Sequence, residues 1–182
     1  RDFRGEGEAA AFLSPTETTT AAVYFFDERP LGEMLTLEAG FRVEDVRVQG
    51  RDRAGLNRDR TFTPLSGALG LVANPLDWLT IGLNGSVNQR APSQVELFAR
   101  GPHEATETFE LGERDLDEET SFTGESRVVA KIDRGKIEWS TFVTQYDDYI
   151  FAALQGIQLN EDGNAPGPGD DPLALIRYAN RD

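Results

Sequence analysis

The chain has 182 residues, a formal net charge of −14 at pH 7 and no cysteine. The acidic excess argues against nucleic acid as a partner, because a phosphate backbone requires a basic protein surface. The lack of cysteine excludes disulfide scaffolds and cysteine-based metal sites. No run reaches the roughly 18 apolar residues of a membrane helix, so only a closed barrel could cross a membrane.

Three stretches alternate between apolar and polar residues with a period of two, which predicts β-strands. In the first stretch one face carries Leu35, Leu37, Ala39, Phe41 and Val43, and the other carries Thr36, Glu38, Gly40, Arg42 and Glu44. In the second, Leu79, Ile81, Leu83, Gly85 and Val87 oppose Thr80, Gly82, Asn84, Ser86 and Asn88. In the third, Val128, Ala130 and Ile132 oppose Thr123, Glu125, Arg127 and Lys131.

The strands group into three hairpins with tight joints that contain turn-forming residues. The pairs are Thr18–Arg29 with Glu33–Val48, Thr63–Ala73 with Trp78–Gln89, and Ser121–Ile132 with Lys136–Phe151. The joints are Pro30–Gly32, Asn74–Asp77 and Asp133–Gly135. A seventh strand begins near Leu173.

Long connections separate the hairpins, namely Gln49–Phe62, Arg90–Thr120 and Ala152–Pro172, and we expect them to be irregular. Such loops are uncommon in a compact soluble domain. Short turns at one rim and long loops at the other are typical of an outer-membrane barrel. The predicted fold class is therefore all-β, an antiparallel transmembrane β-barrel.

Aromatic residues stand near the predicted turns. Tyr24, Phe25 and Phe26 precede the first, and Trp78 and Trp139 follow the second and third. In a membrane barrel we expect all five in a girdle at the rim of the short turns. Alternation alone is equally typical of a soluble β-sandwich, and the loop asymmetry and the aromatics favour the barrel.

About seven strands cannot make a wide barrel, and single-chain bacterial barrels have even strand numbers. The chain also starts at Arg1 without a Met. We therefore expect residues 1–182 to be one segment of a longer barrel.

The stretch Arg90–Phe98 resembles the segment R-A-P-S-x-x-E-L of TonB-dependent outer-membrane receptors. Gly101–Gly112 and Leu116–Ser121 are similar to the family run G-P-H-x-A-T-x-x-F-E-x-G followed by L-x-x-E-x-S. Tyr146–Ile150 is similar to the family's F-x-D-Y-I strand, and Leu175–Asn180 resembles the strand opening that follows. These matches cover about half the chain in family order, and the part before about Phe62 matches only as generic barrel strands.

The resemblance implies a barrel of about 22 strands, an N-terminal plug and a contact box for the TonB energy-transducing complex. It implies uptake across the cell outer membrane of a scarce ligand such as a metal ion, siderophore or haem. The implied partners are outer-membrane lipid, the TonB complex through the plug region, and a small ligand or metal chelate. Neither the plug nor the box is visible in this sequence, and the ligand stays open.

Four residues of the second long connection are candidate ligand contacts: His103, Glu104, Glu107 and Glu110. Imidazole and carboxylate groups suit zinc and similar ions. A single histidine held for structure or free in solvent is the competing interpretation. No further histidine is present to complete a high-affinity site.

Two sets of acidic residues are further, weaker candidates for a functional role. The run of Glu104, Glu107, Glu110, Glu113, Asp115, Asp117, Glu118 and Glu119 could concentrate cations, or it could be a solvated loop. Asp162, Asp170 and Asp171 lie among glycines as in calcium loops, but the EF-hand spacing is absent.

The family motif residues are Arg90, Ala91, Pro92, Ser93, Glu96 and Leu97. Ser93 followed three residues later by Glu96 predicts a capping box at the start of a helix, so we expect the motif to be structural. The polar faces of the strands supply candidates for the barrel lumen, which are wall residues first and ligand contacts second: Glu38, Arg42, Asn84, Asn88, Glu125 and Arg127.

An enzyme is not expected, and neither is a cofactor. No Gly-x-Ser-x-Gly elbow, P-loop or Rossmann fingerprint is present. The alternatives to a receptor are a passive porin-like channel, which would lack an upstream plug, and a soluble β-sandwich binding module.

Overall fold

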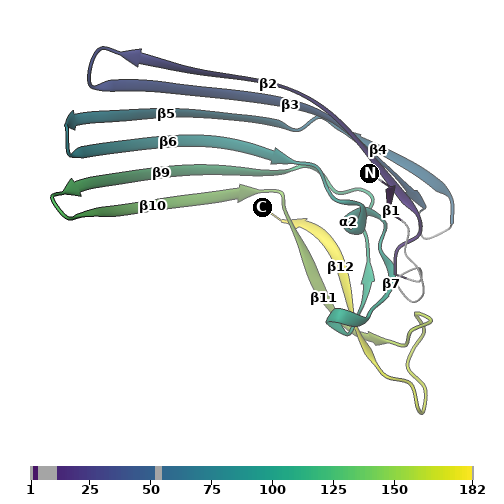
Figure 1. Ribbon diagram of the computed structural model, residues 1–182. Coiled ribbons are helices and arrows are strands. Elements are labelled where there is room, and N and C mark those ends of the chain that lie inside the picture. The colour runs from purple at the N-terminus through teal and green to yellow at the C-terminus, as the bar shows by residue number, and fades with distance from the viewer. Residues whose placement is uncertain (1, 4–11, 52–54, 182) are drawn as a thin grey trace.

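The computed structural model describes residues 2–3, 12–51 and 55–181 (Figure 1). Among these residues no helix has the length and apolarity needed to cross a membrane. The elements are β1 Asp2–Phe3, β2 Thr16–Leu31, β3 Leu35–Arg51, β4 Asn57–Phe62, β5 Leu65–Leu76, β6 Leu79–Arg90, α2 Gln94–Phe98, β7 Arg100–His103, η1 Glu104–Thr106, β8 Thr108–Leu111, β9 Glu119–Ile132, β10 Gly135–Asp147, β11 Tyr149–Leu159 and β12 Leu173–Arg181.

The long strands β2, β3, β5, β6, β9 and β10 pair antiparallel in that order and form a continuous wall (Figure 1). Short turns join β2 to β3, β5 to β6, and β9 to β10, all at one end, which we call the turn end. The other end, where the long connections lie, is the loop end. The three predicted hairpin turns and the pairing of the strands that flank them are confirmed, as is the strand that begins at Leu173.

The pairing register aligns the predicted faces across the wall. Leu71 of β5 pairs with Leu37 of β3 and Leu83 of β6, which continues one apolar row over three strands. Asn84 pairs with Glu125 of β9 in the neighbouring polar row. Because side chains alternate between the faces of a strand, the wall has one apolar and one polar face, as predicted.

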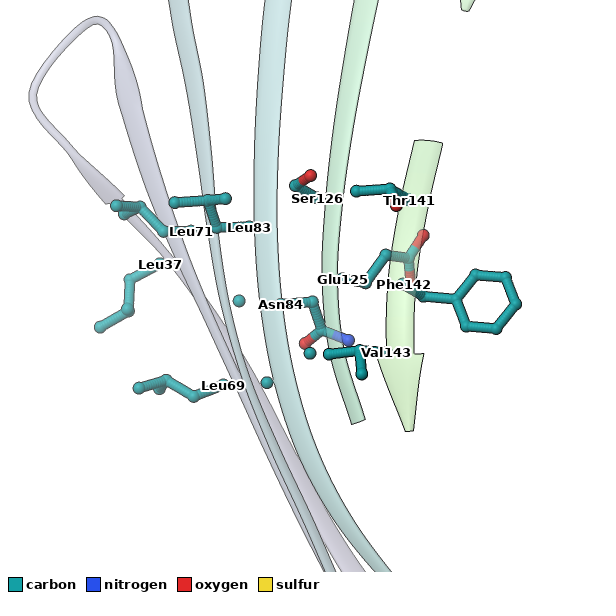
Figure 2. Close-up of a pocket in the computed structure, with 13 residues that line it drawn as sticks. Leu37, Leu69, Leu71, Leu83, Asn84, Glu125, Ser126, Thr141, Phe142 and Val143 are labelled. Carbon is teal, nitrogen blue, oxygen red and sulfur yellow. The ribbon is translucent and has the colours of Figure 1, made fainter. Parts of the chain in front are cut away.

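The apolar face stays open. Leu69 and Leu83 are 59% and 55% exposed. A groove of about 640 Å³ lies among these leucines and Leu37, Leu71 and Val143, beside the glycine pair of β6 and β9 (Figure 2). Leu37 and Leu83 are therefore not buried together beneath a second layer, which a soluble sandwich would require.

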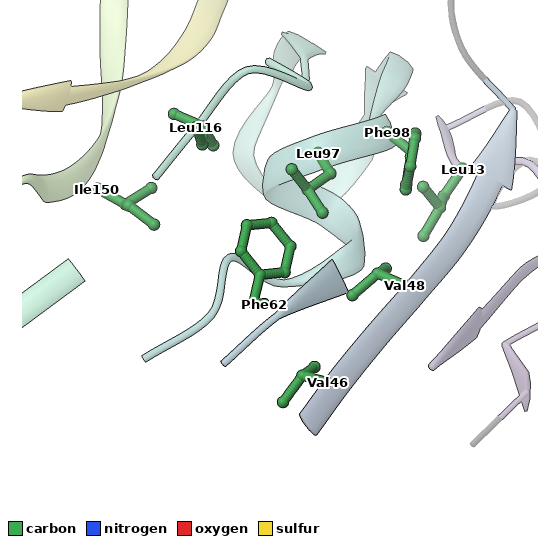
Figure 3. Close-up of a cluster of buried hydrophobic side chains, with 8 residues drawn as sticks. All are labelled: Leu13, Val46, Val48, Phe62, Leu97, Phe98, Leu116 and Ile150. Atoms are coloured by element: carbon green, nitrogen blue, oxygen red, sulfur yellow. The ribbon is translucent and has the colours of Figure 1, made fainter. Parts of the chain in front are cut away.

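The packed core lies instead at the loop end. Its buried members come from β3, β4, α2, the start of β11 and two connections: Leu13, Val46, Val48, Phe62, Leu97, Phe98, Leu116 and Ile150 (Figure 3). Val46 and Val48 have the same strand parity as Glu38 and Arg42, so the cluster lies against the polar face of the wall.

The long connections are more ordered than the sequence predicts. Arg90–Thr120 contains α2, β7, η1 and β8, and β4 occupies the end of Gln49–Phe62, of which residues 52–54 lie outside the described part. The first part of the interval Ala152–Pro172 is wrong as a loop, because β11 continues to Leu159, whereas residues 160–172 are an irregular connection as predicted. The predicted strand Lys136–Phe151 is also wrong as one piece, since β10 ends at Asp147 and β11 joins a second sheet in the order β11-β12-β8-β7.

The aromatic girdle is only partly correct. Trp139 pairs with Val128 near the turn end, and Trp78 lies in the turn between β5 and β6. Phe25 lies on the apolar face but pairs with Phe41, in register with Val87 toward the loop end, so it is not in a girdle at the turn end. Tyr24 pairs with Arg42 on the polar face. Three consecutive aromatics cannot share one face of a strand, because successive side chains point to opposite sides.

Candidate ligand-contact site at the loop end

The helix α2 opens the second long connection with the predicted capping box. The backbone N–H of Glu96 donates to Oγ of Ser93 at 3.3 Å, and the N–H of Ser93 donates to Oε2 of Glu96 at 2.6 Å. Pro92 before the cap is fully buried. The capping prediction is confirmed, and it fixes where the chain turns inward from β6.

Arg90 joins this cap to the wall. Its Nη1 donates to Oε2 of Glu96 at 2.9 Å, and its Nη2 donates to Oε2 of Glu119 at 3.1 Å. Arg90 and Glu119 are cross-strand partners at the ends of β6 and β9. One guanidinium therefore holds the end of β6, the start of β9 and the first turn of α2 together, as its fork of donors allows.

The segment after β8 lies directly against α2. The N–H of Gly112 donates to the carbonyl of Ala99 at 2.7 Å, and the N–H of Glu113 donates to the carbonyl of Glu96 at 2.8 Å. A Cβ on Gly112 would lie 2.6 Å from the backbone of Leu97 and Phe98. Only glycine permits this approach, which presses Leu97 and Phe98 into the apolar cluster (Figure 3).

Glu110 of β8 is a buried carboxylate with partners on three strands. Its Oε1 lies 2.7 Å from Nδ1 of His103 on β7, and its Oε2 accepts from Oη of Tyr178 on β12 at 2.8 Å. Thr108 donates to Oε1 at 3.2 Å. Because an ionised carboxylate only accepts, Nδ1 of His103 carries the proton.

Burial raises the pKa of Glu110, but the hydrogen bonds from His103 and Tyr178 outweigh burial and hold the pKa below its usual value. Burial and the hydrogen bond to Glu110 raise the pKa of the Tyr178 phenol well above its ordinary value. At neutral pH Glu110 is therefore a charged acceptor and the Tyr178 hydroxyl a protonated donor. Buried polar groups satisfied in this way fix geometry rather than present a free ligand.

The structure brings His103 and Glu110 together and separates their two companions from the core of the network. The side chain of His103 is 37% exposed and its ring stacks on Phe12 at 4.6 Å between centroids. Glu104 lies in η1 and Glu107 follows it, and both are exposed on the surface. Among the described residues no three His, Asp or Glu side chains gather closely enough to hold a metal ion.

Sequence reasoning missed Tyr178. The pairing that brings it to Glu110 is a parallel one, with β12 alongside β8. Contacts between strands so distant in the chain leave no periodic signal in either segment. Tyr178 was visible only as part of a strand.

The suspected calcium loop has a different organisation. Oδ2 of Asp170 accepts from the N–H of Gly167 at 2.8 Å and from Nδ2 of Asn160 at 3.0 Å. These bonds lower the pKa of Asp170. Asp162 and Asp171 are exposed. Asp170 closes a turn in the connection between β11 and β12.

The six lumen candidates share the polar face of the wall. Arg42 pairs with Glu44 at 2.5 Å, and Nε of Arg127 donates to Glu138 at 2.8 Å. Asn88 donates to Ser86 at 3.3 Å. Glu38 and Asn84 flank Gly70, and a Cβ there would lie 3.2 Å from Oε2 of Glu38. The face is a polar surface with charges of both signs.

A protein-family model described as "TonB dependent receptor-like, beta-barrel" matches residues 3–180. The chain belongs to this family. As a TonB-dependent receptor wall, it uses the polar residues of R-A-P-S-x-x-E-L for the cap and the Arg90 link described above.

Two curated relatives match most of this chain. Hemoglobin and hemoglobin-haptoglobin-binding protein A of Haemophilus influenzae is 22% identical over 192 residues, which cover 80% of this chain and 18% of the relative. Transferrin-binding protein A of Neisseria meningitidis serogroup B is 30% identical over 144 residues, which cover 79% and 15%. The chain thus spans less than a fifth of either relative.

A solved structure of the Serratia marcescens hemophore receptor HasR, as a double mutant in complex with its hemophore HasA and heme, has the same fold. The TM-score is 0.73 at 17% sequence identity, over 96% of this chain and 31% of HasR. The relatives are receptors and binding proteins rather than enzymes. The chain accordingly forms a partial, open barrel wall, built mostly of antiparallel strands.

Proposed function

We propose that this chain forms part of the wall of an outer-membrane receptor that takes up a scarce ligand with energy from TonB. One observation carries the membrane part of the proposal: the large apolar side chains of the wall stay exposed in rows, while the opposite face is polar. In water such a face would be an aggregation surface, whereas hydrocarbon accommodates it without cost. The polar face then lines the bore.

The family supports the transport part. Plug, contact box and remaining strands would lie in other parts of the full-length protein, of which residues 1–182 supply one segment of the wall. The names of the relatives refer to haemoglobin, transferrin and a heme-carrying hemophore. We therefore infer that the ligand is a scarce source of iron, which could be the metal ion, a siderophore complex or haem.

For the site itself, we propose that its residues have two different roles, one structural and one in ligand contact. Glu110 is satisfied internally by His103 and Tyr178 and serves as the structural centre. The exposed carboxylates of Glu104 and Glu107 and the open side of the His103 ring are the groups positioned to meet a ligand.

Transport is tested with the full-length protein in cells starved of iron, with and without a working TonB. Haem, haemoglobin and a ferric siderophore are supplied one at a time as the only iron source. Growth on at least one of them that requires both the protein and TonB supports the proposal. Growth that depends on the protein but continues without TonB would indicate a passive channel.

The roles of these groups at the loop end are tested with the double variant Glu104→Ala/Glu107→Ala against Glu33→Ala/Asp133→Ala, which removes two exposed carboxylates from turns at the turn end. We expect only the loop-end variant to raise the ligand concentration needed for half-maximal growth. Equal behaviour of both variants would make Glu104 and Glu107 part of a solvated loop.

A further inference from the structure

The strands β10 and β11 meet at a corner of one residue. β10 pairs within the wall up to Asp147 with Thr120, and β11 pairs with β12 in the second sheet from Tyr149 with Arg181 onward. Asp148 between them has a φ of 53°, in the left-handed region that residues other than glycine rarely adopt. Figure 1 shows the chain leaving the wall abruptly at this point.

Glu119 fixes the corner from the side of the wall. The backbone N–H of Ile150 donates to Oε2 of Glu119 at 3.0 Å, and the same carboxylate binds Nε and Nη2 of Arg90 at 3.3 and 3.1 Å. The Glu119 side chain is only 12% exposed. This carboxylate therefore connects the first residue of β9 to the second residue of β11.

Asn180 of β12 fixes the corner from the other side. Its Nδ2 donates to the carbonyl of Asp148 at 2.6 Å, and its Oδ1 accepts from the N–H of Asp117 at 2.9 Å. Both ends of the amide are used, and a carboxylate or an aliphatic side chain could not replace them together. The corner carbonyl is thereby tied to the connection that precedes β9.

Ile150 adds an apolar anchor directly after the corner. It is 5% exposed and belongs to the cluster with Leu116 and Phe62 (Figure 3). Tyr146 and Tyr149 meet edge to face across the corner, with centroids 5.2 Å apart. The backbone is held in an unfavourable conformation by contacts that come from three other parts of the chain, as expected where such a conformation persists.

We propose that Asp148 is a fixed corner and that Glu119 and Asn180 are positioning residues, which set the direction in which the β11–β12 hairpin leaves the wall. The exposed turn of that hairpin, residues 160–172, is thereby presented in one orientation at the loop end. A preset orientation lowers the entropic cost of capturing a ligand. Its consequence for capture rests on the proposed function, whereas the corner itself does not.

The test measures distances between spin labels in the full-length protein in lipid, without any ligand. This chain has no cysteine of its own, so within it the labels attach only at introduced positions. One pair, at Arg134 and Gln158, spans the corner. A control pair, at Glu33 and Arg134, joins two turns of the wall.

We expect one narrow distribution for both pairs in the otherwise unchanged protein. The variant Glu119→Ala/Asn180→Ala should broaden and displace the corner distribution and leave the wall distribution unchanged. Glu119→Gln, which keeps an acceptor for Ile150, should restore the narrow distribution when Asn180 is intact. Asp148→Gly should also stay narrow, because glycine adopts this φ freely and both contacts remain.

Two results would overturn the proposal. A corner distribution that is unchanged in the double variant would mean that the apolar cluster alone sets the direction. A parallel change in the wall pair would mean that Glu119 and Asn180 hold the fold as a whole. Neither result depends on whether the protein transports a ligand, so a failure of the corner is distinguishable from a failure of the transport function.

Discussion

Replacing Leu83 with Arg tests directly whether the apolar face meets hydrocarbon. Ten steps separate Leu79 from Gln89 on β6. At about 3.4 Å per residue they span roughly 34 Å, which a strand tilt of about 40° reduces to a rise of roughly 26 Å. This rise matches the ~25 Å apolar band of outer-membrane barrels, and Leu83 lies roughly 10 Å from its turn-end edge, close to the midplane.

A charge at that depth costs about 2–4 kcal/mol, and the central position of Leu83 places the expected cost in the upper part of this range. The free energy of unfolding is measured by denaturant titration of the full-length protein in lipid vesicles. Asn84→Arg is the matched control, because the neighbouring residue points to the polar face beside Glu125. We expect Asn84→Arg to change the free energy by less than about 1 kcal/mol. A Leu83→Arg variant as stable as Asn84→Arg would refute the assignment of the faces.

Three further predictions concern the loop end. Gly112→Ala should lower the free energy of unfolding by about 1–3 kcal/mol, since its Cβ would lie 2.6 Å from the α2 backbone, whereas Gly85→Ala, with open space around it, should be neutral or slightly stabilising. Ser93→Ala should cost about 1 kcal/mol in the same denaturant titration through loss of the helix cap. The lowered pKa of Glu110 makes its contribution complete above the ordinary carboxyl pKa of about 4.3 and lost as pH falls through the folded value. The stability difference between the unmodified protein and Glu110→Gln should therefore shrink below about pH 4.3, and a pH-independent difference would contradict the charged state of Glu110.

The wall could be predicted from the sequence because its causes are local. Alternation assigned Leu37 and Leu83 to one face and Glu38 and Asn84 to the other, and the turn residues located all three hairpins. The family motif likewise supplied the cap at Ser93, since a capping box lies within four residues.

The loop end could not be predicted in the same way, because its geometry comes from contacts between distant segments. The corner at Asp148 needs Asn180, and the position of α2 needs Gly112. No glycine or proline interrupts Lys136–Phe151, so the sequence predicts one strand through Asp148. Of the four predicted contacts, His103 and Glu110 were close in the chain and in space, but the role of Glu110 depends on Tyr178 of β12.

The apolar cluster at the loop end and the apolar face of the wall are expected to meet different solvents. Hydrocarbon surrounds the proposed outer face of the wall, so removal of side chains from water contributes little to how those rows hold together after insertion. The cluster around Val48 and Leu97, in contrast, is stabilised by the hydrophobic effect, which weakens on cooling and in urea. The loop end and the wall should therefore lose their order under different conditions. On cooling, the packing at the loop end should weaken while the strand pairing of the wall persists.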